Sequence, residues 1–221
     1  MKLTRKIYVG LGLALLASGA ELFAQGTFQN LDFESANIPP GTPSGAIVPT
    51  GAALPGWNVG AQTLYYDDAS LGGPLISIDD AKNIPPLQGN YSMLLFGGYN
   101  GPSAISQTGL VPANAQSILM DVAFSPSALF TVTLGAQTIS MSPVLVLPNY
   151  TVYGGNVSAE AGQVEALTIS QFDVPPPEVP PPELELDNII FSPNPIPEPE
   201  TWSLLLCGAG LLVVIQQFRK P

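Results

Sequence analysis

The sequence predicts an all-β protein, a jelly-roll-like β-sandwich that follows a signal peptide and precedes a single C-terminal transmembrane helix. Between the two ends, apolar residues recur with a period of two, and Gly, Pro and Asn interrupt them at short intervals. No long amphipathic helical pattern occurs there. We therefore expect the following organisation: a signal peptide at 1–24, the sandwich domain at 25–192, a Pro-rich linker at 193–201, and the helix with its basic tail at 202–221.

Three segments carry the clearest strand pattern. In 118–124 the residues Ile, Met, Val and Phe alternate with smaller or polar ones, with Leu119 as the exception, and 130–134 alternates apolar residues with Thr. In 183–190 we expect Leu184, Leu186 and Ile190 to share a buried face while the acidic residues between them face solvent. Shorter patterns predict further strands at 28–33, 63–66, 75–78, 91–96, 104–107, 137–141, 144–147 and 167–172.

The charge is distributed unevenly along the 221 residues. The net charge is −11, yet five of the six basic residues lie at the two ends. Residues 25–196 hold fourteen Asp and Glu against Lys82 alone, a balance of 1 − 14 = −13. Such a body repels phosphate backbones, so nucleic acid is excluded as an expected partner. Most of these carboxylates are expected to be solvated.

Composition also removes most catalytic chemistry. The chain has no histidine, and its one cysteine, Cys207, lies in the apolar C-terminal segment. Triads and dyads that depend on His, and zinc sites of His and Cys, therefore cannot form. We expect a protein that is not an enzyme. The alternative is a glycan hydrolase that uses one carboxylate from Asp67-Asp68 and one from Asp79-Asp80, brought together across strands.

The N-terminus has the layout of a secretory signal peptide. Basic residues within 2–6 precede an apolar run at 7–16, and small residues follow. Cleavage is expected after Ala20 or after Ala24. The apolar run is too short to span a bilayer, so the segment is read as a leader and the protein as exported.

The C-terminal segment is predicted to enter the membrane. Residues 202–218 would form a helix of about 25 Å, slightly shorter than the hydrocarbon core of about 30 Å. Trp202 suits the outer interface, whereas Arg219 and Lys220 suit the cytoplasmic side. This bias of positive charge places the body outside the cell.

A recognisable motif precedes that helix. Pro197, Glu198 and Pro199, followed by the apolar helix and the terminal basic residues, resemble the PEP-CTERM sorting signal of bacterial envelope proteins. The resemblance covers about 25 residues and implies processing by exosortase, a membrane-embedded transpeptidase-like enzyme. It also implies delivery to the cell surface or the extracellular matrix, in bacteria that generally produce exopolysaccharide.

The body shares weaker features with a second family. An opening strand at 30–34, a Pro-Gly-Trp turn at 55–57 and a closing strand at 184–191 resemble the galactose-binding-like, carbohydrate-binding jelly-roll modules. That resemblance implies a structural calcium ion, which would map onto Glu34 and Asp187. No other cofactor is expected.

Aromatic rings are the expected sugar contacts, because flat rings stack on pyranose faces. The candidates are Trp57, Tyr65, Tyr66 and Tyr99. The sequence therefore predicts an exported, biofilm-associated protein whose sandwich contacts exopolysaccharide. A purely structural or adhesive surface protein is the other alternative that the sequence leaves open.

Overall fold

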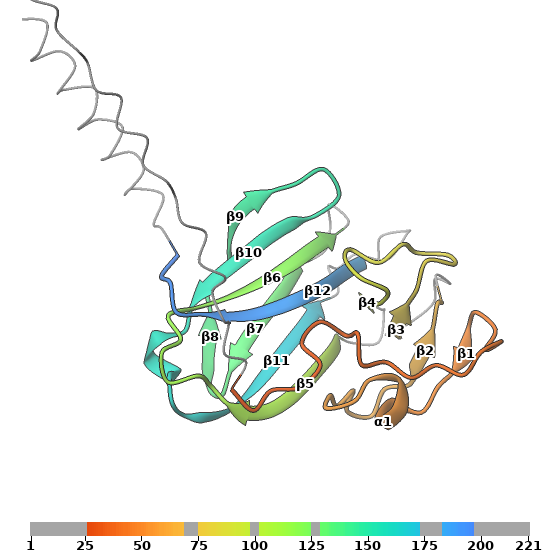
Figure 1. Ribbon diagram of the computed structural model, residues 1–221, viewed down its shortest axis with the longest axis horizontal. Coiled ribbons are helices and arrows are strands. Elements are labelled where there is room, and N and C mark those ends of the chain that lie inside the picture. Colours follow the sequence, from red (N-terminus) through yellow and green to blue (C-terminus); the bar gives the residue numbers. More distant parts are fainter. Residues whose placement is uncertain (1–25, 69–74, 98–101, 125–128, 173–182, 197–221) are drawn as a thin grey trace, which may run out of the picture.

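The computed structural model confirms an all-β protein built from two sheets (Figure 1). It describes residues 26–68, 75–97, 102–124, 129–172 and 183–196. The predicted signal peptide, the sorting motif and the transmembrane helix lie outside these residues. Within the described part, the helices α1 (Thr50–Ala53) and η1 (Ser158–Glu160) are single turns, and neither is long enough to cross a membrane.

The larger sheet, sheet A, has eight strands in the order β1-β2-β3-β4-β12-β6-β10-β9. All neighbours are antiparallel except β2 and β3, which are parallel. The strands are β1 (Ala46–Ile47), β2 (Leu64–Tyr66), β3 (Leu75–Asp79), β4 (Ser92–Phe96), β6 (Ser117–Phe124), β9 (Ser142–Val146), β10 (Thr151–Asn156) and β12 (Glu183–Ser192).

The smaller sheet, sheet B, has four antiparallel strands in the order β5-β11-β7-β8. They are β5 (Ser103–Leu110), β7 (Leu129–Leu134), β8 (Gln137–Ile139) and β11 (Val164–Phe172). Successive strands of the chain alternate between the two sheets from β4 to β7, so most contacts in the core join residues far apart in the sequence.

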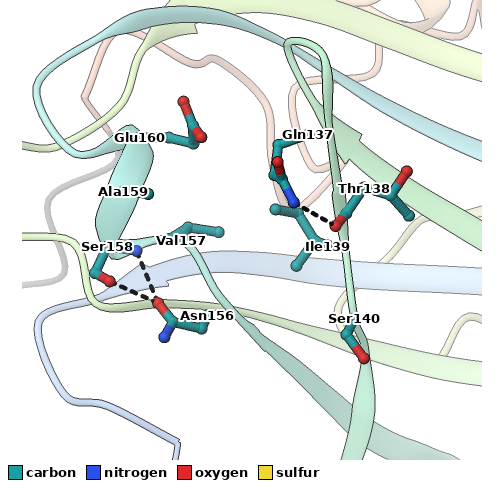
Figure 2. Close-up of a pocket in the computed structure, with 9 residues that line it drawn as sticks. All are labelled: Gln137, Thr138, Ile139, Ser140, Asn156, Val157, Ser158, Ala159 and Glu160. Atoms are coloured by element: carbon teal, nitrogen blue, oxygen red, sulfur yellow. Dashed lines mark hydrogen bonds between the residues drawn. The ribbon is translucent and has the colours of Figure 1, made fainter.

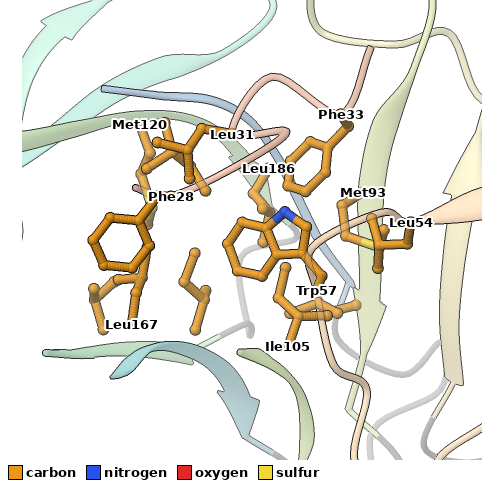
Figure 3. Close-up of a cluster of buried hydrophobic side chains, with 14 of the residues drawn as sticks. Phe28, Leu31, Phe33, Leu54, Trp57, Met93, Ile105, Met120, Leu167 and Leu186 are labelled. Carbon is orange, nitrogen blue, oxygen red and sulfur yellow. The ribbon is translucent and has the colours of Figure 1, made fainter. Parts of the chain in front are cut away.

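One hydrophobic core fills the space between the sheets (Figure 3). The inward residues of each strand supply it, for example Met93 and Leu186 from sheet A and Ile105 and Leu167 from sheet B. Each of these four side chains is fully buried. The alternation predicted for 118–124 and 130–134 is confirmed where the structure describes side chains: Met120 and Val132 point inward, whereas Thr131 and Thr133 are only half-buried.

The strand predicted at 28–33 is wrong. This segment is a covering loop that closes one end of the sandwich and buries Phe28, Leu31 and Phe33. Phe33 has a positive φ of 57°, and its backbone N–H closes a turn onto Asn30. The apolar residues of this segment alternate with polar ones because a turn and an irregular stretch direct them into the core. This arrangement buries the apolar side chains as effectively as a strand would.

A β-bulge in β12 overturns one detail of the predicted pattern. Its register against β6 shifts between Asp187 and Ile190, and Asn188 takes a positive φ of 49°. A bulge adds one residue and so reverses the alternation beyond it. Ile189 therefore joins the core, and Ile190 does not share the inner face of Leu184 as expected.

No strand is predicted at 151–156, where the structure has β10. This strand lies next to the edge strand β9 and contains Gly154 and Gly155. Both positions lack room for a side chain. A Cβ on Gly154 would lie 2.5 Å from Ile196, and one on Gly155 would lie 2.3 Å from Ile139. Glycine in a strand often marks such a close approach rather than a turn.

Candidate functional site

A row of carboxylates lies on the outer face of sheet A, the face directed away from sheet B. Antiparallel pairing sets Asp79 opposite Ser92 and Asp187 opposite Asp121, while Glu185 lies opposite Leu94. Asp79, Asp121 and Asp187 are at most 2% exposed. The prediction of a solvated face on β12 is therefore wrong, because loops and neighbouring side chains cover these carboxylates.

Burial dominates the electrostatics of this row. It raises the pKa of Asp79 to about 7 and that of Glu185 to about 8, and neighbouring carboxylates add to both shifts. Asp79 Oδ2 and Glu185 Oε1 are buried without a hydrogen-bond partner. Lys82 does not compensate them, because it pairs with Asp80 at 3.7 Å and lies over the ring of Tyr66. Both carboxyl groups are thus stabilised in the protonated form.

Ser92 connects Glu185 with Asp187. Its hydroxyl accepts the N–H of Leu87 at 2.7 Å and donates to Asp187 at 3.0 Å. Ser92 also shares a hydrogen bond with Glu185. Burial and the neighbouring carboxylates raise the pKa of Glu185, whereas the hydrogen bond with Ser92 acts in the opposite direction and lowers it. Burial and the neighbouring negative charges therefore outweigh this hydrogen bond.

The predicted calcium ligands hold the same loop from two positions. Glu34 accepts the backbone N–H groups of Asn90 and Tyr91 at 2.6 and 3.0 Å. Asp187 accepts the backbone N–H of Gln88 at 3.0 Å. These contacts order residues 87–92, and they lower the pKa of Glu34 although burial acts against them.

Calcium at Glu34 and Asp187 stays a prediction. Within the described ranges, no three or more Asp, Glu, His or Cys residues converge in a way that could hold a metal ion. The two carboxylates are instead engaged by backbone donors, so in this arrangement they act as loop anchors.

The two acidic pairs do meet across strands. Asp67 follows β2 and its backbone N–H bonds to Ile78 of the parallel strand β3, which places Asp67 beside Asp79. Both carboxylates are fully buried. Ser44 and Asn83 donate to Asp67, and Ser77 donates to Asp79 at 2.5 Å. This pair is enclosed by protein donors rather than open to a substrate.

The predicted aromatic residues are placed differently from one another. Trp57 is only 6% exposed, and its indole N–H donates to Asn30 O at 2.9 Å. Tyr66 is buried and its hydroxyl bonds to Asp80. Only Tyr65 is half-buried, whereas Tyr99 lies outside the described residues. Trp57 therefore does not offer the open ring face that stacking on a sugar requires.

A polar pocket lies where β8 approaches the end of β10 (Figure 2). Its volume is about 420 Å³, within the usual range for small-molecule sites. Hydroxyl and amide groups share the lining about equally with apolar groups, and Glu160 supplies its one carboxylate. The lining residues are Gln137, Thr138, Ile139, Ser140, Asn156, Val157, Ser158, Ala159 and Glu160.

Local hydrogen bonds arrange two side chains of the pocket. Asn156 Oδ1 accepts from the backbone N–H and the hydroxyl of Ser158 at 2.9 and 2.8 Å, which orients its amide. Gln137 donates to the carbonyl of Thr138 at 3.4 Å, and both residues are exposed. β8 is an edge strand, so one side of its backbone is not paired within the described sheet.

Sequence reasoning missed this pocket. Its polar residues come from two segments, 137–140 and 156–160, and none belongs to a fixed-spacing motif. The one available signal is the cluster of Asn, Ser and Gln at 137–140 and 156–158, which reads equally well as turn sequence. Only the folding of β8 against the end of β10 brings the two segments together.

The sorting residues Pro197, Glu198 and Pro199 follow directly after the last described residue, Ile196, and lie outside the described part. No protein-family model and no curated protein sequence matches the chain.

Proposed function

We propose that the chain is an exported bacterial envelope protein, sorted by its C-terminal segment, whose β-sandwich binds neutral polysaccharide in the pocket between β8 and η1. The observation that carries the binding proposal is the lining of that pocket. Amides and hydroxyls each both donate and accept hydrogen bonds, as sugar hydroxyl groups do. Gln137, Thr138 and Asn156 offer these groups at the surface.

Charge favours a neutral polysaccharide over an acidic one. Glu160 is the only charged residue of the lining, and the body around it carries fourteen acidic residues against one basic residue. An anionic glycan would be repelled. No aromatic ring lines the pocket, so binding rests on hydrogen bonds, and we expect weak affinity for one site.

The strand order supports a jelly roll within the sandwich class. The strand order includes β4-β12-β6-β10 in sheet A and β5-β11-β7-β8 in sheet B. For these eight strands, this is the order expected of two interleaved Greek keys, which is the topology of a jelly roll. Lectin domains are among the proteins that use this architecture. The strand order thus favours a binding module, although a fold does not by itself fix a function.

A glycan hydrolase is the less favoured reading. Hydrolysis needs two carboxylates that contact the substrate. Asp67 and Asp79, the members of the acidic pairs that meet, are both fully buried, and protein hydroxyl groups already donate to each. The purely adhesive alternative differs from our proposal in requiring no sugar at all.

The pocket is tested by measuring binding of the full chain to an array of neutral polysaccharides. We expect Gln137→Ala to weaken binding about five- to tenfold, the loss of one net hydrogen bond of about 1 kcal/mol. Gln29→Ala is the matched control, because it removes an exposed glutamine from the covering loop beside β5, at the opposite edge of sheet B from β8. Weaker binding by Gln29→Ala alone would place the sugar at that loop and contradict the pocket.

The sorting role is tested separately by cell fractionation. A chain that lacks residues 197–221 is expected in the culture medium, because it retains its leader but loses its membrane segment and motif. Glu198→Ala, which keeps the apolar segment, is expected to remain in the membrane fraction at its unprocessed length. If the truncated chain occupies the envelope in unchanged amount, the sorting role is wrong, whatever the result for glycan binding.

A further inference from the structure

The strands at one side of the sandwich contain no charged residues. Residues 122–159 contain no Asp, Glu, Lys or Arg, although the net charge of the chain is −11. This stretch forms β7, β8, β9 and β10. In the two sheets these strands lie at the same end, since sheet A ends β10-β9 and sheet B ends β7-β8 (Figure 1). Another molecule that carries the same negative charge is repelled least when it approaches this side.

The edge strand on that side, β9, is apolar and open. All five of its residues are exposed, and Val144, Leu145 and Val146 are 43%, 52% and 74% exposed. Within the described sheet, β9 pairs with β10 only, so its other edge presents backbone N–H and C=O groups. Edge strands are usually protected by charged side chains, and β9 has none. The closest protective feature is Pro143 near its start.

We propose that β9 pairs antiparallel with β9 of a second copy of this chain, which joins the two larger sheets into one. A strand supplies what this edge lacks, since it satisfies backbone donors and acceptors while it covers the apolar side chains. The pairing is self-complementary and closes as a two-fold dimer. It does not depend on the proposed glycan pocket.

The position of the C-terminal end fits this dimer. The last described residue, Ile196, lies above Gly154 on the outer face of sheet A, next to Leu119 and Val144. The two-fold axis of an antiparallel strand pair is perpendicular to the sheet, so the outer faces of both copies point the same way. Ile196 of both copies would then lie on one face, which suits two chains delivered to the same membrane.

The opposite edge of sheet A is not an equivalent partner. β1 has only two residues, and although Ile47 is 69% exposed, the acidic residues Asp67 and Asp80 lie close by, directly after the strands β2 and β3. Pairing of β9 with β1 of another copy would also leave free edges and build a fibre rather than a closed dimer. A lipid surface would leave the β9 backbone groups without strand partners.

Disulfide crosslinking in membranes tests the pairing directly. In full-length Cys207→Ser, single cysteines are introduced as Val144→Cys, Leu145→Cys and Val146→Cys, and the membranes are mildly oxidised. We expect a covalent dimer from at least one of the three, because opposite residues in an antiparallel pair are close enough for a disulfide. Thr108→Cys, at an exposed position of sheet B, is expected to stay monomeric. Dimers of equal yield at all four positions, or at none, would overturn the proposal.

A charge substitution tests it without oxidation. Leu145→Lys places a cation on the open edge, and we expect it to weaken dimerisation of the detergent-solubilised full chain by about tenfold or more in light scattering. Ile47→Lys is the matched control and should leave the dimer intact. At a protein concentration low enough to keep all three chains monomeric, unfolding curves should coincide for wild type and both variants, since each substituted residue is largely exposed. A monomeric wild type, or a loss of association in Ile47→Lys but not in Leu145→Lys, would refute the β9 dimer.

Discussion

Trp57→Ala is expected to lower the free energy of unfolding by about 3–5 kcal/mol, as is usual when a large aromatic side chain is removed from a core. The indole packs against Phe33 with ring centroids 5.6 Å apart and lies among Met93 and Ile105 (Figure 3). Its N–H donates to the carbonyl of Asn30, which also accepts the backbone N–H of Phe33, so the substitution removes one of the two hydrogen bonds to that carbonyl.

The measurement is urea unfolding of the full chain followed by far-ultraviolet circular dichroism. Tyr65→Ala, which removes a half-buried ring from the outer face of sheet A, serves as the control and should cost much less. If Trp57→Ala left stability unchanged but abolished glycan binding, Trp57 would be a sugar platform rather than a core residue.

The second large effect is a loss of stability as the pH rises. Burial raises the pKa of Asp79 to about 7 and of Glu185 to about 8, above the ordinary values of 3.8 and 4.5. At pH values between the ordinary and the raised pKa of each group, the unfolded chain has released a proton that the folded chain still holds. The free energy of unfolding therefore falls with rising pH in this range. The contribution is complete below about pH 4 and is lost as the pH passes about 7 to 8.

Asp79→Asn isolates this effect. The substitution removes the ionisable group from a site where the other nearby charged groups, Asp67, Asp68, Asp80 and Glu185, are acidic. We expect wild type to lose on the order of a few kcal/mol between pH 5 and pH 9, and the variant to lose clearly less.

Urea unfolding at several pH values gives the slope directly. Asp32→Asn is the matched control, because Asp32 is exposed and its removal should leave the slope unchanged. A wild-type stability that increased from pH 5 to pH 9 would contradict the buried, protonated state of Asp79 and Glu185.

Strand prediction succeeded where each strand has one face in the core and one outside. The segments around Met120, Val132 and Leu184 alternate apart from Leu119 and the bulge in β12, and the structure places these three residues in the core. Strand prediction failed where the close approach of other side chains determined the residue types. No strand is predicted for β10, because Gly154 and Gly155 are residues that strands usually lack, whereas both are glycine because side chains of neighbouring elements occupy the space.

The candidate site was less predictable than the fold. Trp57 is predicted as a sugar contact because flat rings stack on pyranose faces, yet residue type alone does not reveal whether an aromatic ring points into the core. The carboxylates of β12 alternate with leucines, which predicts solvation, but loop 80–91 and the side chains around it bury Asp187.

By itself, the sequence determined the class of the fold, the charge of the body and the absence of histidine chemistry, because local periodicity and composition fix these. Tertiary structure alone decided which carboxylates are buried, where the polar pocket forms and which strand is left at the open edge. Each of these three features depends on contacts between segments that are distant in the chain, such as 137–140 and 156–160. A local sequence pattern does not indicate which distant segment a residue will contact.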